Sequence, residues 1–460
     1  MTGKSLGTKF LSANAFIIAT AIIGLTIDCM AYFPGMLSPD SVDQYRQALS
    51  HQYSDWHPPI MAAFWSVLIH IYPGGASMFL LQVFCFWMAY FILCRIALQH
   101  FRKVVFIIPF LFFAPFTQNF VGNIWKDIGL SISWLLAVAV MLRSFYNSRP
   151  LTKWEAALTL MLLCYGCWIR INALPGVIPL LSLWFITLFR NNGLSSKKLI
   201  SYTLLLGSLL LAVQLGITRL ILKPLKTYPE YKLFVHDLSG IYKKTGQVYF
   251  PSFILRHPDF DTAYIRRKYK YSTFDNIWWN SDSVRVLPDP SPAQMDSLQW
   301  AWIKGITHNP LVYLSNRGAG FLNFLRLYPS GSRLTITYAD THPNNLGLSF
   351  KRRRITINMR SGIEFQRSMP WMQPWFWVLL NIIVLVLAYR PVYIEIKPVI
   401  LCLAYSSLFY LLLEFIVFQA DTELRYFYWN ILAVSLSLLL LLGQRLKLKY
   451  NEKVGAKTNN

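Results

Sequence analysis

Long apolar segments recur along the chain and constrain its fold more than any other feature. Hydrophobic residues make up 55% of the 460 residues, and charged residues only 14%. A helix that crosses a membrane needs about 20 mostly apolar residues and satisfies its backbone hydrogen bonds internally. The sequence therefore predicts an all-α polytopic membrane protein with about ten transmembrane helices, at 10–34, 76–97, 104–118, 124–142, 154–170, 173–189, 199–222, 374–389, 397–418 and 424–443.

Lysine and arginine residues are unevenly distributed between the two sides that these spans define. If the N-terminus is cytoplasmic, 18 of them lie in the short connections and tails on that side. The opposite short loops hold only four, namely Arg46, Lys126, Arg170 and Arg425. Because positively charged short loops stay in the cytoplasm, we expect both termini to be cytoplasmic.

The spans divide the chain into three regions. Residues 1–222 form an N-terminal transmembrane region, and 374–460 form the last three helices with a basic cytoplasmic tail. Between them, 223–373 is expected to be an external mixed domain of about 150 residues. This domain holds 21 Lys and Arg against 10 Asp and Glu, which indicates an anionic lipid or phosphate partner. Membrane flanks explain much of the net charge of +23, so a nucleic-acid partner is not expected.

The first external loop, 35–59, carries acidic residues directly after the first span. Asp40, Asp43 and Asp55 lie in it, together with His57. The apolar stretch 58–72 is short for a span and is followed by Pro73-Gly74-Gly75, so we expect an interfacial helix that holds the loop against the membrane. Carboxylates in such a place can accept protons, which makes these four residues candidates for catalysis.

Cationic residues on the same side are candidates for binding a phosphate. Lys126 opens the fourth span, Arg170 closes the fifth, and Arg425 lies between the last two. Arg317 of the external domain is a fourth candidate. Ionisable residues at helix ends also serve as simple membrane anchors, and this alternative stays open for each of them. Together, however, they predict one external mouth with proton acceptors and phosphate-binding cations.

Several common chemistries lack their motifs. The chain has no P-loop, no G-x-G-x-x-G and no H-E-x-x-H, so it shows no motif for nucleotide hydrolysis or for the commonest zinc proteases. All six cysteines fall within or at the edges of predicted spans, and none in the external domain. A disulfide framework or a thiolate metal site is therefore not expected there.

The first loop resembles that of the GT-C superfamily of integral membrane glycosyltransferases, especially bacterial members related to protein mannosyltransferases and the lipid A aminoarabinose transferase. The resemblance depends on Ser38-Pro39-Asp40-Ser41-Val42-Asp43-Gln44 and Asp55-Trp56-His57-Pro58-Pro59, with weaker support from Trp125-Lys126-Asp127, Trp302-Ile303-Lys304, the stretch from His308 to Tyr313, and Glu423-Leu424-Arg425-Tyr426. It covers most of the chain in architecture, but at the level of motifs only about the first 60 residues.

This resemblance implies transfer of a sugar from a polyprenyl-phosphate donor to a glycan, lipid or protein acceptor at the external face of a bacterial inner membrane. It implies that Asp40 activates the acceptor, assisted by Asp43, Asp55 and His57. Lys126, Arg170, Arg317 and Arg425 would hold the donor phosphate. Many members carry adjacent acids or an acid-x-acid triplet, whereas two residues separate Asp40 from Asp43 here. The departure leaves open which carboxylate acts and whether a divalent cation takes part.

Two other functions remain open from the sequence. An O-antigen ligase or polymerase has many spans and a large external loop, and it also acts on lipid-linked sugars. A transporter or flippase of lipid-linked sugars would place polar residues inside the spans, as at Asp28, Gln82, Gln214 and Glu414. The chain shows no evident inverted repeat of broken helices, which disfavours a transporter.

Overall fold

The protein is built from helices. The structure, a computed structural model, describes residues 3–258, 260–279, 286–328, 334–416 and 423–458. Helix accounts for 72% of the chain, and the described residues form isolated β-bridges but no strand. The all-helical class is therefore confirmed. The predicted span 104–118 differs from the structure. The predicted span 397–418 extends beyond the described residues at its end.

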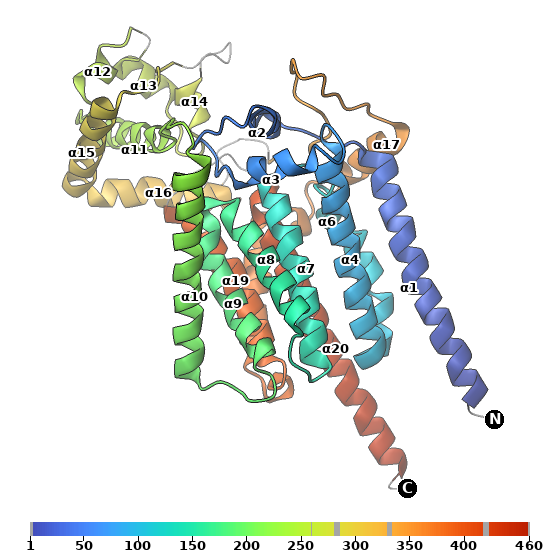
Figure 1. Ribbon diagram of the computed structural model, residues 1–460. Coiled ribbons are helices and arrows are strands. Elements are labelled where there is room, and N and C mark those ends of the chain that lie inside the picture. Colours follow the sequence, from blue (N-terminus) through green and yellow to red (C-terminus); the bar gives the residue numbers. More distant parts are fainter. Residues whose placement is uncertain (1–2, 259, 280–285, 329–333, 417–422, 459–460) are drawn as a thin grey trace.

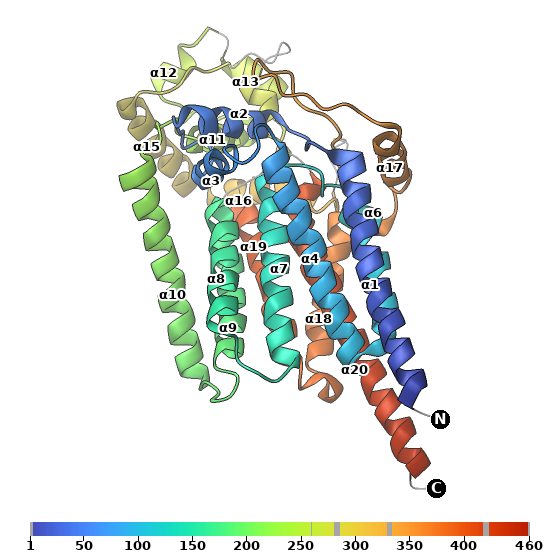
Figure 2. The same cartoon turned by 45° about the vertical axis from the view of Figure 1, so that its right-hand side comes forward.

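Long apolar helices lie side by side and form the body of the molecule (Figures 1 and 2). They are α1 (Gly3–Tyr32), α4 (Ala76–His100), α7 (Lys126–Tyr146), α8 (Lys153–Trp168), α9 (Leu174–Leu188), α10 (Ser196–Gly216), α18 (Pro374–Ala388), α19 (Lys397–Ile416) and α20 (Tyr428–Thr458). Five stretches of the described chain are long and apolar enough to cross a membrane: Ala13–Tyr32, Ala76–His100, Lys126–Tyr146, Ser196–Leu222 and Leu424–Glu452. This composition is typical of a multi-pass membrane protein.

Helix α7 is the centre of the bundle. It packs against α4, α8 and α20, and 89% of its apolar window is buried inside the protein, against 11% for α10. The contact with α8 is close because Gly166 has no side chain. A Cβ at that position would lie 2.4 Å from Nε1 of Trp134 on α7. Small residues permit such close packing between apolar helices, so α7 and α8 lie close together at Trp134.

The predicted span 104–118 is wrong as a single helix. The segment forms three short helices, η1 (Arg102–Phe106), α5 (Ile108–Phe112) and α6 (Pro115–Gln118). Pro109 and Pro115 each lie in the first turn of a new helix. A proline lacks the backbone N–H and disfavours helix in the residue before it, so it starts helices and interrupts continuous ones. The broken segment still returns the chain from the end of α4 to the end of the bundle where α6 lies (Figure 1).

Shorter helices cover the end of the bundle that lies away from both termini (Figure 1). Helix α2 (Pro39–Ser50) and α3 (Ile60–Leu68) follow α1 there, so the helix predicted at 58–72 is shorter than expected. The two pack together through Tyr45 and Trp65, whose rings lie 5.3 Å apart. The Nε1 of Trp65 also donates to the Gly74 carbonyl at 3.2 Å.

Residues 223–373 extend over the same end. Their first part contains α11 (Glu230–Thr245), α12 (Ser252–Leu255), α13 (Thr262–Lys268), α14 (Asp275–Trp278), α15 (Pro292–His308) and α16 (Pro310–Phe324). It has a hydrophobic core of its own, which includes Tyr231, Leu238 and Leu298. An extended segment, 334–350, then leads to α17 (Arg354–Phe365).

A buried ion pair lies beside this second core. Arg317 on α16 donates to Asp237 on α11 at 2.7 Å, and both side chains are almost fully buried. The indole of Trp302 donates to the same carboxylate at 2.9 Å. A charge buried in this way needs its partner, because the low-dielectric interior does not replace its lost hydration.

We expect Arg317→Ala to lower the free energy of unfolding by about 3–5 kcal/mol, since it leaves the buried Asp237 carboxylate without its cation. The melting temperature of the purified protein measures this loss. Lys304→Ala is the matched control because Lys304 is exposed on neighbouring α15. Equal melting temperatures for both variants would contradict a structural role for the Arg317 pair.

Candidate active site

The motif Ser38-Pro39-Asp40-Ser41 forms the beginning of helix α2. The Ser38 hydroxyl accepts a hydrogen bond from the Ser41 backbone N–H at 3.4 Å, and Pro39 occupies the first turn. Serine caps and first-turn prolines are favoured at helix starts. Asp40 therefore lies in the first turn, where the helix dipole favours a negative charge.

Backbone hydrogen bonds join this helix start to two distant segments. Met36 pairs with the loop before α7, with Met36 N–H donating to the Gly122 carbonyl at 3.0 Å. Leu37 N–H donates to the Asp340 carbonyl at 3.2 Å. The Ser41 hydroxyl donates to the Ile124 carbonyl at 2.7 Å. These bonds hold Asp40 beside the start of α7 and beside the segment 334–343.

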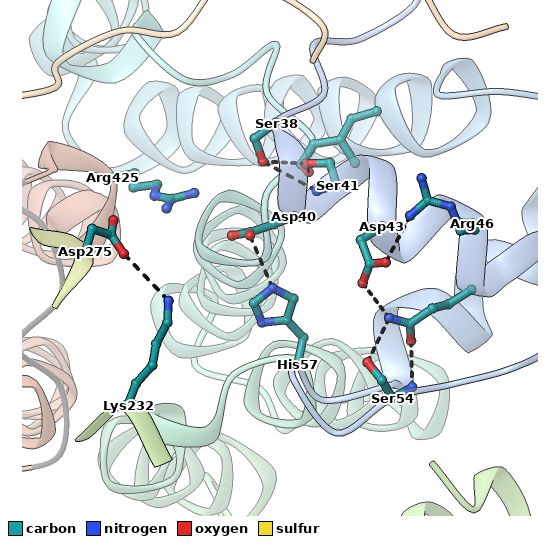
Figure 3. A network of polar contacts seen from close by, with 12 residues as sticks. Ser38, Asp40, Ser41, Asp43, Arg46, Ser54, His57, Lys232, Asp275 and Arg425 are labelled. Atoms are coloured by element: carbon teal, nitrogen blue, oxygen red, sulfur yellow. Dashed lines mark hydrogen bonds and ion pairs between the residues drawn. The ribbon is translucent and has the colours of Figure 1, made fainter. Parts of the chain in front are cut away.

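Asp40 and His57 face each other across the first loop (Figure 3). The His57 Nε2 lies 3.4 Å from Oδ1 of Asp40, and the His57 side chain is the more buried of the two. Asp43, one turn along α2, accepts instead from Gln47 Nε2 at 2.7 Å and from Arg46 at 3.2 Å. Asp40 is therefore the carboxylate directed at His57.

Asp55 has a different setting from the other predicted acids. Its Oδ1 accepts from the backbone N–H of Thr227 at 2.6 Å and from its hydroxyl at 2.7 Å. Next to it, the Trp56 ring lies 4.9 Å from the Nζ of Lys232, which also pairs with Asp275 (Figure 3). Asp55 thus fastens the first loop to the chain that follows α10.

The predicted cations lie at the ends of three other segments. Lys126 and Asp127 begin α7, and Asp127 pairs with Arg170 at 2.8 Å. Arg425, at the start of the last span, pairs with Glu423. Its guanidinium lies 4.4 Å from the centre of the Trp125 ring, a cation–π contact that fixes its position.

Electrostatic coupling shows that these groups form one cluster. Burial of the Asp40 carboxyl favours its neutral form, but His57, Lys126 and Arg425 outweigh burial and hold the pKa of Asp40 well below its ordinary value. Burial and the charge of Lys126 lower the pKa of His57, against the opposing effect of Asp40. At neutral pH the pair is therefore an aspartate beside a neutral imidazole.

Lys126 differs from Arg170 and Arg425 because no carboxylate partner is seen for it in the described part of the chain. Arg170 and Arg425 are each paired with a carboxylate. Lys126 is only 7% exposed, and within the described part of the chain no carboxylate lies in ion-pair contact with it. A buried cation without a direct counter-ion attracts an anion strongly, because little solvent screens it.

The carboxylates do not form a ready site for a divalent cation. Among the described residues, no three His, Cys, Asp or Glu side chains are grouped as metal ligands. Asp127 and Glu423 are engaged by arginines, and Asp40 faces His57. Oxygen-ligated cations need several such groups together, so the residues present do not fit this metal.

The structure brings together Asp40, His57, Lys126, Arg170 and Arg425, which were all singled out from the sequence. Asp43 lies nearby with other partners, whereas Asp55 and Arg317 are engaged elsewhere by Thr227 and Asp237. The sequence motifs contained Asp127 and Glu423, but their role as partners of the arginines was not predicted.

Tyr338 is a member of the site that no motif indicated. Tyr338 lies on the extended segment 334–350, and its ring is 5.4 Å from that of Trp125.

Comparison of the chain with protein-family models, curated proteins and solved structures finds no match. The site must therefore be interpreted from its own geometry.

We expect His57→Gln to reduce the loss of stability on acidification. Because the pKa of His57 is depressed in the folded protein, the unfolded chain binds more protons, and the stability present above about pH 6.5 falls as the pH drops below it. Melting temperatures between about pH 7 and pH 5 measure the slope. His70→Gln, at an exposed histidine, is the control. An unchanged slope in His57→Gln would refute the neutral buried imidazole.

Proposed function

We propose that the protein is a membrane glycosyltransferase that moves a sugar from a polyprenyl-phosphate donor to a glycan, lipid or protein acceptor. The observation that carries the proposal is the juxtaposition of an ionised carboxylate, Asp40, with Lys126, a buried lysine that has no carboxylate in ion-pair contact among the described residues. Transfer of this kind needs a proton acceptor for the incoming nucleophile and a positive charge for the departing phosphate.

In the proposed reaction, an acceptor hydroxyl or amine attacks the anomeric carbon of the donor sugar. The bond between that carbon and the phosphate oxygen breaks, and the electron pair leaves with the polyprenyl phosphate. Asp40 takes the proton of the nucleophile, and Lys126 stabilises the negative charge that develops on the phosphate.

His57 and the arginines have supporting roles in this proposal. The neutral imidazole orients the Asp40 carboxylate without neutralising it, so that the carboxylate keeps its capacity to accept a proton. Arg425 and Arg170 retain positive potential at the site although each has a partner. Their positions are fixed by stacking on Trp125 and Tyr426, so little reorganisation is needed as charge develops.

The membrane arrangement is part of the proposal. Ten crossings, with 104–118 as a broken one, would place the site and residues 223–373 outside a bacterial inner membrane and both termini in the cytoplasm. The excess of Lys and Arg on the side of the termini supports this orientation. The start of α1 and the end of α20 also lie at the same end of the bundle, away from α2 (Figures 1 and 2). A lipid-linked donor suits an external site, where soluble nucleotide sugars are not expected.

Asp40→Asn is expected to lower sugar transfer by at least about a hundredfold, because an amide cannot accept the proton. The measurement is transfer of radiolabelled sugar from a polyprenyl-phosphate donor pool into membrane glycans, at matched protein levels. Asp43→Asn, on the next turn of α2, is the matched control and should retain transfer. Full transfer by Asp40→Asn would overturn the assignment and favour the ligase or transporter alternatives.

Orientation can be tested with introduced cysteines. The six native cysteines are buried or half-buried, so they give little background labelling. In intact cells we expect a membrane-impermeant maleimide to label Ser361→Cys on α17 but not Lys449→Cys on α20, both at exposed positions. Lysis should make both accessible. Labelling of Lys449→Cys alone in intact cells would reverse the proposed orientation.

A further inference from the structure

A groove lies between the segment 334–343 and helix α17, outside the group of charges described above. It consists of two adjoining cavities of about 230 Å³ and about 320 Å³. Thr337 and Arg360 line both of them. Tyr338, Thr341 and Arg352 line the first cavity, and Leu334, Glu364 and Arg367 line the second.

The three arginines that line this groove differ in whether a carboxylate pairs with them. Arg352 is paired with Asp340, and Arg367 with Glu364. Arg360 lies between them and contacts both cavities, yet within the described part of the chain no acid pairs with it. A planar guanidinium in this position can donate two hydrogen bonds to an oxyanion.

The hydroxyl groups of the groove are a second indication of a ligand, independent of Arg360. The Oγ1 of Thr341 is buried and has no hydrogen-bond partner among the residues that the structure describes, although Thr341 lines the first cavity. A buried hydroxyl is usually satisfied, because leaving it unpaired costs about 1–3 kcal/mol. Thr337, also buried, adds a second hydroxyl beside Arg360. Two hydroxyls and a guanidinium form a suitable donor set for phosphate oxygens.

The groove lies at the end of a helix that faces lipid. Thr356 on α17 donates to the Ala31 carbonyl, and Arg353 donates to the Met30 carbonyl at 2.7 Å, so α17 is bound to the last turn of α1 (Figure 2). Met30 is 55% exposed in that turn, and Phe365 on α17 is 82% exposed. Exposed apolar side chains next to arginines are typical of helices that lie in a membrane interface.

We propose that this groove binds the phosphate of an anionic lipid headgroup, with Arg360 as its principal ligand and Thr337 and Thr341 as hydrogen-bond donors. The groove is distinct from the cluster around Lys126, because neither cavity is lined by Asp40, Lys126 or Arg425. The lipid would enter beside α1 and α17. The inference does not depend on the sugar-transfer reaction.

The test uses the purified full-length protein in a neutral detergent, with bound lipid counted by native mass spectrometry. Phosphatidic acid is the probe, phosphatidylcholine is the zwitterionic comparison, and inorganic phosphate is added alone in a third arm. We expect phosphatidic acid to bind in preference to phosphatidylcholine. Arg360→Gln should weaken its binding about tenfold, the effect of losing a charge-assisted contact.

Arg354→Gln is the matched control, because Arg354 is exposed at the start of the same helix and lines neither cavity. It should bind phosphatidic acid as the wild type does. If Arg360→Gln does not fold, Thr341→Val tests the same site by removing one donor at nearly constant shape, and weaker binding is again expected.

Three results would overturn the inference. The first is unchanged binding of phosphatidic acid in Arg360→Gln, or in Thr341→Val where that variant is used instead. The second is an equal loss in Arg354→Gln, which would indicate general surface attraction. The third is binding of inorganic phosphate equal to that of phosphatidic acid, which would exclude a lipid-specific site. Because no transfer is measured, failure of the proposed glycosyltransferase function would leave these results interpretable.

Discussion

The arrangement of the site depends on placing charges at the start of the most buried helix. Lys126 and Asp127 begin α7 where the protein leaves little water around them. Charges in such surroundings must be paired or must face a ligand. Asp127 pairs with Arg170, which follows α8, whereas no carboxylate in the described part of the chain is in ion-pair contact with Lys126. Lys126 is therefore the buried amine at this helix start whose charge an anionic ligand would compensate.

Backbone pairing then brings distant parts of the chain to that helix start. Met36 and Leu37 bond to the loop before α7 and to the segment 334–343, and Leu424 bonds to Thr335 of the same segment. Segments separated by hundreds of residues therefore meet without forming a sheet. The extended segment 334–343 is common to both sites, because Tyr338 contacts Trp125 at the start of α7 and also lines the groove beside α17.

Much of this arrangement could be predicted, because hydropathy locates the helices. Charged residues at helix ends on the same side of the predicted membrane are then expected to meet at one surface. That reasoning singled out Asp40, Lys126 and Arg425. It did not give the tertiary partners of these residues: the structure shows Asp55 bonded to Thr227 and Arg317 paired with Asp237, and sequence alone indicates neither contact. Prolines broke the predicted span 104–118, and the irregular segment 334–343 carries no periodicity that could have indicated its role.

The most direct test of the account is an electron cryomicroscopy structure of the protein with a polyprenyl phosphate bound. The account predicts that the phosphate lies within hydrogen-bonding distance of the Lys126 Nζ, on the side that faces Asp40. A phosphate bound away from both Lys126 and Asp40 would contradict it, whatever the occupancy of the groove beside α17.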